Sequence, residues 1–174
     1  MYSNCCLLIV DVQNGFINEH TRHLPGAIAQ FIQTHSFGSV IATAYCNTPS
    51  NACFRLGGWT DCMENTPSAE LVPEIKPYVS RIFKKHTFSG LTSLMREYLA
   101  DNNFEKIYIC GVNTDCCVLA TAFSLYDNLI DCCVIEDLCA STLGEQKHNA
   151  AIQLLKDNIT ELRIVRSTEL SGSF

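Results

Sequence analysis

The stretch IYICGVNTDCCVLATA, residues 107–122, decides the fold class into which the rest of the chain must fit. An apolar run rich in β-branched residues enters Gly111, passes through polar residues that can cap a helix, and leaves as an almost wholly apolar segment. This order predicts a buried strand, a sharp turn and a helix with a cysteine in its first turn. The unpaired backbone N–H groups of a first helical turn favour negative charge, so a thiol placed there is expected to have a lowered pKa and to act as a nucleophile.

The rest of the chain alternates short apolar runs with segments of helical periodicity. Strands are predicted over residues 5–10, 40–45, 79–83, 106–110, 130–135 and 162–165. Helices are predicted from Pro25 to near Gly38, over 91–99, from the turn after 111 to about Asn128, and over 144–158, with Leu94 and Leu154 facing the core. Alternating strands and helices indicate βαβ units, a parallel sheet and right-handed crossovers. The length fits one domain spanning residues 1–174.

A long segment between Cys46 and Pro77 shows no periodicity and is rich in turn-forming residues. Such a loop inside a compact domain is usually functional, for instance as a pocket wall or a lid. It contains Arg55 and the lone Trp59, which are candidates for binding a substrate carboxylate and for stacking on a flat group. The alternative is that the two residues only stabilise the loop.

Composition narrows the classes of partner. The formal charge of −6 and the absence of basic runs disfavour nucleic acid and anionic membranes as partners, so a small molecule is expected. Only 17% of the residues are charged, which indicates that part of the surface is buried in a homo-oligomer. The N-terminal apolar run stops at Asp11, too short for an export signal, so we expect a cytoplasmic protein.

The eleven cysteines are odd in number, and most lie inside apolar runs. Together with the missing export signal, this favours free thiols in the core over disulfides. Cys46, Cys53 and Cys62 share the long loop, but their spacing does not form a CxxC pair, so zinc binding there is the less favoured alternative. No cofactor or metal is expected.

Reactive side chains follow the predicted strands. Asp11 follows the first strand, Tyr45 ends the second, Lys84 and Lys85 follow the third, the turn at 111–117 follows the fourth, and Asp137 follows the fifth. In open α/β sheets the ligand site lies beyond these carboxyl ends, so a carboxylate, an ammonium group and a thiol are expected to converge. Each has a plainer alternative, because Asp11 can cap a turn, Lys85 can be a solvated lysine and Cys117 can be a core residue.

Four motifs in order resemble the isochorismatase-like cysteine hydrolase superfamily, which includes nicotinamidases and N-carbamoylsarcosine amidases. LLIVDVQNGF (residues 7–16) is similar to its DxQNxF opening, and KHTFSGL (85–91) to its KxxxSxF segment, with Leu91 in place of phenylalanine. GVNTDCCV (111–118) resembles the GVxTDxCV signature, and Asp137, Ser141 and His148 match a further segment. The resemblance spans residues 6 to about 165.

This resemblance implies a doubly wound, three-layer α/β/α fold with a mostly parallel sheet. It also implies a catalytic triad of Asp11, Lys85 and Cys117, in which the nucleophile is the second cysteine of the pair and Cys116 occupies a variable position. A cis peptide is expected between Val112 and Asn113, and the backbone N–H groups of Asn113 and Cys117 are expected to form an oxyanion hole.

The resemblance further narrows the reaction. Nicotinamidases carry a histidine-containing metal motif after the second strand, but here no histidine lies between His35 and His86, which disfavours nicotinamide. A nucleophilic cysteine favours hydrolysis of a small amide or N-carbamoyl substrate. The alternatives are isochorismatase-type hydrolysis, or a member of the same fold that is catalytically inactive or acts in thiol redox chemistry. The candidate substrate-binding residues are Gln13, Phe16, Tyr45, Arg55, Trp59 and Cys116.

Overall fold

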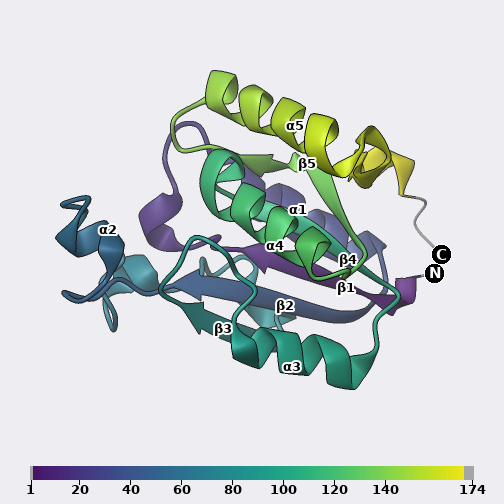
Figure 1. Ribbon diagram of the computed structural model, residues 1–174, viewed down its shortest axis with the longest axis horizontal. Helices are drawn as coiled ribbons and strands as arrows, with labels where there is room; N and C mark the ends of the chain where they lie inside the picture. Colours follow the sequence, from purple (N-terminus) through teal and green to yellow (C-terminus); the bar gives the residue numbers. More distant parts are fainter. Residues whose placement is uncertain (1, 171–174) are drawn as a thin grey trace.

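The computed structural model describes residues 2–170, which form a six-stranded parallel sheet with helices on both faces (Figure 1). The strands lie in the order β3-β2-β1-β4-β5-β6, and every neighbouring pair is parallel. Their bounds are β1 Tyr2–Val10, β2 Phe37–Tyr45, β3 Arg81–Lys85, β4 Lys106–Val112, β5 Cys132–Ala140 and β6 Ile164–Val165. This confirms the predicted doubly wound α/β fold.

The principal helices are α1 Leu24–Thr34, α2 Ala52–Arg55, α3 Ser93–Asn102, α4 Leu119–Asp127 and α5 Glu145–Ile159. In Figure 1, α3, α4 and α5 lie in front of the sheet and α1 lies behind it, as right-handed crossovers require when the strand order reverses beside β1. The short α2 lies outside the layers, in the loop that follows β2 (Figure 1). None of the described helices is long and apolar enough to cross a membrane.

The core follows from the apolar strands. From Cys6 to Val10, β1 is fully buried between the two helical layers, as expected for a central strand of a parallel sheet. All eleven cysteines are free thiols, and nine of them are buried. This confirms the prediction that most cysteines are core residues and that the chain does not form a disulfide framework. Leu94 and Leu154 were predicted to face the core, and this prediction is wrong, because the two residues are 63% and 49% exposed.

Several predicted boundaries are also wrong, and three of them bear on the site. The first helix ends at Thr34, and Gly38 lies within β2, where a Cβ atom would come within 2.1 Å of the Ser3 carbonyl oxygen. β3 includes Lys84 and Lys85 rather than ending before them. β5 continues to Ala140, so Asp137 lies inside the strand, where its carboxylate accepts hydrogen bonds from the N–H and hydroxyl of Ser167.

Candidate active site

Asp11, Lys85 and Cys117 meet at the carboxyl edge of the sheet. Asp11 directly follows β1, Lys85 is the last residue of β3, and Cys117 lies in the turn that follows β4. Lys85 Nζ is 2.8 Å from Asp11 Oδ2 and 3.4 Å from Cys117 Sγ. The structure therefore brings the three predicted catalytic side chains into one connected group.

Lys85 and Asp11 are held in place by neutral partners. Lys85 Nζ donates to the carbonyl oxygens of Thr87 at 2.8 Å and Phe88 at 3.0 Å, and the lysine side chain is fully buried. The Thr43 hydroxyl donates to Asp11 Oδ1 at 2.7 Å and accepts the Asp11 N–H at 3.2 Å. Asp11 has a positive φ of 51°, a conformation that aspartate tolerates better than most residues, and it directs the carboxylate toward Lys85.

The electrostatics of this group raise the pKa of the Cys117 thiol. The neighbouring Cys116 thiol, burial and the Asp11 carboxylate raise the pKa of Cys117 and together outweigh Lys85, which lowers it. Burial acts to lower the pKa of Lys85, but the Asp11 carboxylate and the Cys117 sulfur together outweigh burial, so the pKa of the lysine is raised. The pKa of Cys117 is thus shifted in the direction opposite to that expected from the helix N-terminus alone, because the Cys116 thiol, burial and the Asp11 carboxylate act on it as well.

The turn after β4 differs from the regular helix start expected from sequence. Residues Thr114–Val118 form a π-type turn before α4 begins, and the Asn113 carbonyl accepts the N–H groups of Cys116 at 3.0 Å and Val118 at 3.1 Å. The peptide bond between Val112 and Asn113 is cis, as predicted. Gly111 has a φ of +121°, and a Cβ atom there would be 2.2 Å from the Val10 carbonyl oxygen, so this position requires glycine.

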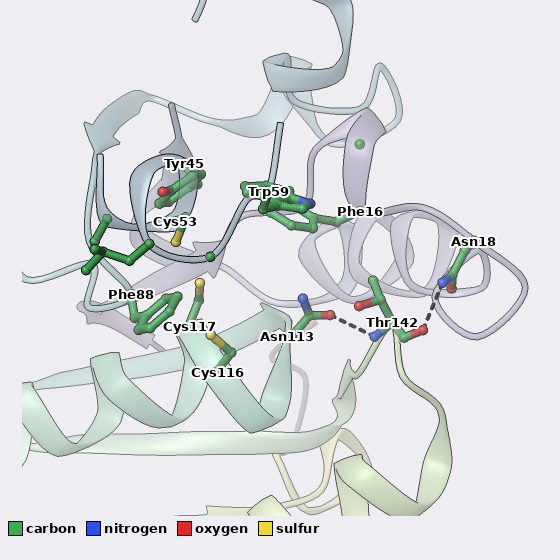
Figure 2. A pocket seen from close by; sticks show the side chains of 14 residues that line it. Phe16, Asn18, Tyr45, Cys53, Trp59, Phe88, Asn113, Cys116, Cys117 and Thr142 are labelled. Atoms are coloured by element: carbon green, nitrogen blue, oxygen red, sulfur yellow. Dashed lines mark hydrogen bonds between the residues drawn. The ribbon is translucent and has the colours of Figure 1, made fainter. Parts of the chain in front are cut away.

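A cavity of about 640 Å³ opens in front of Cys117 (Figure 2). Four of the predicted substrate-binding residues line it, namely Phe16, Tyr45, Trp59 and Cys116. The full lining is Gly15, Phe16, Asn18, Tyr45, Ala52, Cys53, Leu56, Gly57, Trp59, Phe88, Asn113, Cys116, Cys117 and Thr142. The long loop after β2 therefore supplies a pocket wall through residues 52–59, which was one of its two expected roles.

Gln13 and Arg55 do not line this cavity. Gln13 is fully buried: its side chain exchanges hydrogen bonds with the backbone of Tyr45, at 2.9 and 2.8 Å, and donates to the Ala69 carbonyl at 2.7 Å. It positions Tyr45 and does not face a ligand. Arg55 is exposed on α2, where one turn of helix directs its neighbours Cys53 and Leu56 to the cavity instead.

The aromatic side chains of the cavity lie against one another. The rings of Phe16 and Trp59 are stacked, with centroids 5.7 Å apart and an interplanar angle of 17°, and Tyr45 tilts against Trp59 at 5.6 Å. Figure 2 shows these rings above the cavity, the sulfur atoms of Cys53 and Cys117 facing it, and Phe88 at its side. Phe88 was missed from sequence although it lies between Lys85 and Ser89, inside the lysine motif.

Metal-binding side chains do not gather in the described part of the chain. Between residues 2 and 170, no group of three or more histidine, cysteine, aspartate or glutamate side chains is placed to hold a metal ion. After β2, the Asn47 amide donates to the carbonyl oxygens of Trp59 at 2.8 Å and Asp61 at 3.2 Å, so it stabilises the loop. The side chains of residues 2–170 therefore do not fit a protein-bound metal ion at this site.

Comparisons with known proteins identify the family to which the chain belongs. A model of the isochorismatase domain matches residues 5–168. The nicotinamidase of Acinetobacter baylyi is 27% identical over 178 residues, covering 79% of this chain and 81% of that protein. Two solved structures share the fold. PnC1 from L. infantum, in complex with nicotinate, has a TM-score of 0.86 at 19% identity and covers 99% of this chain and 98% of its own. N-carbamoylsarcosine amidase from Thermoplasma acidophilum has a TM-score of 0.80 at 21% identity, with 97% and 99% covered. Since one family model spans nearly the whole chain, the protein belongs to the isochorismatase-like hydrolase family.

Proposed function

We propose that this protein is a cysteine hydrolase that cleaves the C–N bond of a small amide or N-carbamoyl compound. The observation that carries the proposal is the buried group in which Lys85 contacts both the Asp11 carboxylate, at 2.8 Å, and the Cys117 sulfur, at 3.4 Å, at the inner end of an open cavity. An acid, a cation and a thiol in contact supply the base, the counterion and the nucleophile of covalent amide hydrolysis.

In the first step, the Asp11 carboxylate accepts the proton of the Cys117 thiol as the sulfur attacks the substrate carbonyl carbon. The Lys85 ammonium group stabilises the developing thiolate, which is needed because the resting pKa of Cys117 is raised by Cys116, burial and Asp11. The C–S bond forms and the carbonyl electron pair moves to oxygen. The backbone N–H groups of Asn113 and Cys117 are the proposed donors to this oxyanion.

In the following steps, the tetrahedral intermediate collapses, the C–N bond breaks, and ammonia or an amine leaves with the proton held by Asp11. A thioester on Cys117 remains. Water then attacks the thioester carbonyl while Asp11 accepts a water proton, and the C–S bond breaks to release the acid. The proton returns to the sulfur, so Asp11 is unprotonated again at the end of the cycle.

The proposal is tested by measuring ammonia release from a panel of primary amides and N-carbamoyl compounds. Cys117→Ala removes the nucleophile and is expected to lower kcat/KM by at least about 10⁴-fold. Cys116→Ala is the matched control, because this adjacent thiol also lines the cavity but is not the assigned nucleophile, so this variant should still release ammonia. Full activity in Cys117→Ala would rule out the assigned nucleophile.

The thiol-redox alternative gives a different result in the same experiment. Such a protein would release no ammonia from any amide and would instead show reversible oxidation of Cys116 or Cys117 by peroxide. Nicotinamide is not the substrate that we propose, because the segment after β2 lacks the histidines of the nicotinamidase metal motif.

A further inference from the structure

We infer that the substrate is an uncharged amide with an apolar acyl group, and that amides carrying a carboxylate, such as N-carbamoyl amino acids, are excluded. This inference rests on the proposed amide hydrolysis at Cys117 and names the substrate class for that site. It follows from the charge, shape and hydrogen bonding of the cavity described above.

The cavity offers a substrate carboxylate no cation. None of the described residues that line it carries a charged side chain. The charges closest to the nucleophile, Asp11 and Lys85, have fully buried side chains and are paired with each other at 2.8 Å. A carboxylate that leaves water for this cavity would therefore lose its hydration without gaining an ion pair, which is strongly unfavourable.

The walls instead offer apolar surface. The stacked rings of Phe16 and Trp59 form one side, and two large apolar residues stand at the cavity while exposed to solvent: Leu56 is 88% exposed and Phe88 is 54% exposed. Covering such side chains with an apolar acyl group removes their surface from water, and aromatic walls favour flat or extended hydrocarbon groups.

The polar groups of the cavity are neutral and mostly engaged. Asn113 Oδ1 accepts the Thr142 N–H at 2.7 Å, and Asn18 Nδ2 donates to the Thr142 carbonyl at 2.9 Å, as the dashed lines in Figure 2 show. The Asn113 Nδ2 group makes no hydrogen bond to a described residue, and in Figure 2 it points into the cavity. It is an uncharged donor that can bind the oxygen of a neutral amide, and by itself it does not compensate the charge of a carboxylate taken out of water.

The lone tryptophan provides a direct test of specificity. Trp59 lines the cavity and is the single tryptophan of the chain, so its fluorescence reports ligand binding without turnover. The catalytically inactive Cys117→Ala variant is titrated with 4-methylbenzamide and with 4-carbamoylbenzoate, which differ only in a methyl group against a carboxylate. We expect the neutral amide to bind at least about 100-fold more tightly.

Two variants in the Cys117→Ala background sharpen this comparison. Leu56→Lys places a cation at the cavity wall at an exposed position and is expected to reduce the preference for the neutral amide by at least tenfold. Arg55→Ala is the matched control, because the adjacent Arg55 does not line the cavity, and it should leave the ratio of the two dissociation constants unchanged.

The outcomes separate this inference from the proposed function. Equal or tighter binding of 4-carbamoylbenzoate, or loss of its binding in Arg55→Ala, overturns the inference. Ammonia release by the parent protein from both probes, with the carboxylate preferred, also overturns it and leaves the amidase proposal standing. If neither the probes nor the wider panel yields ammonia, the proposed function fails, while the fluorescence ratio still decides the specificity of the cavity.

Discussion

Replacing Lys85 with methionine is expected to lower the free energy of unfolding by about 3 to 5 kcal/mol, because it removes one partner from a fully buried ion pair. Methionine is similar in length and apolar, so the change removes charge and hydrogen bonds more than volume. The Asp11 carboxylate loses its counterion at 2.8 Å, and the carbonyl groups of Thr87 and Phe88 lose the donor that holds them at 2.8 and 3.0 Å. Each buried acceptor left unpaired costs about 1 to 3 kcal/mol, which agrees with the same range.

The neighbouring Lys84 is the matched control for this experiment. It is also a lysine on β3, but it is exposed and pairs with Glu64 on the surface at 3.1 Å. Exposed ion pairs contribute little to stability, so Lys84→Met should have an unfolding midpoint close to that of the parent. The comparison therefore isolates the effect of burial from that of the substitution itself.

Urea unfolding followed by circular dichroism measures both variants, and a double-mutant cycle with Asp11→Asn tests the pairing directly. The double variant Asp11→Asn/Lys85→Met no longer holds an unpaired buried charge, so it should be at least about 2 kcal/mol more stable than the sum of the single effects implies. If Lys85→Met loses no more stability than Lys84→Met, or if the two single effects simply add, the buried pair does not have the role assigned to it.

Two further predictions concern stability. Gly111→Ala should lower the free energy of unfolding, measured in urea, by at least about 3 kcal/mol, because the new Cβ would lie 2.2 Å from the Val10 oxygen. Gly26→Ala in α1 is the control: its Cβ meets nothing within 4 Å, so it should stabilise the protein by up to about 1 kcal/mol. Equal effects of the two substitutions would contradict the assigned geometry. Stability should also fall as the pH rises from 9 to 10 under reducing conditions, because unfolded thiols release protons that buried thiols keep; a flat profile would refute this. Burial raises the pKa of the Cys6, Cys62 and Cys132 thiols from 9.0 to about 12. Together these three shifts predict that the free energy of unfolding falls by about 3 kcal/mol between pH 9 and pH 10.

Much of the site could be predicted because its residues are attached to elements with strong local signals. The apolar runs before Asp11 and Gly111 are readable as buried strands, and parallel strands bring their carboxyl ends to one edge whatever the loops between them do. The order of the motifs then distinguished Cys117 from Cys116, a choice that periodicity alone left open. The same logic placed Tyr45 and the loop with Trp59 beside the cavity.

Other features depended on directions and distances that no local pattern encodes. Gln13 lies within a recognisable motif, yet its amide turns to the backbone of Tyr45, and Arg55 lies on a single helical turn that directs it to solvent. Asp137 was predicted to follow the fifth strand, but it lies within β5, because the strand continues beyond the point at which the apolar run stops. In each case the residue type was right for a ligand, and the backbone around it pointed elsewhere.

The sequence by itself determined the parallel α/β architecture, because hydrophobic periodicity is a local property of the chain. The resemblance of its motifs to the family predicted Asp11, Lys85 and Cys117 as the catalytic residues. Only the tertiary structure decided that the pKa of Cys117 is raised and that none of the described residues lining its cavity carries a charged side chain. The raised pKa depends on the adjacent Cys116 thiol, on burial and on the Asp11 carboxylate, and the last two act only once the chain has folded. The lining of the cavity likewise depends on the fold, because it comes from several separate parts of the chain.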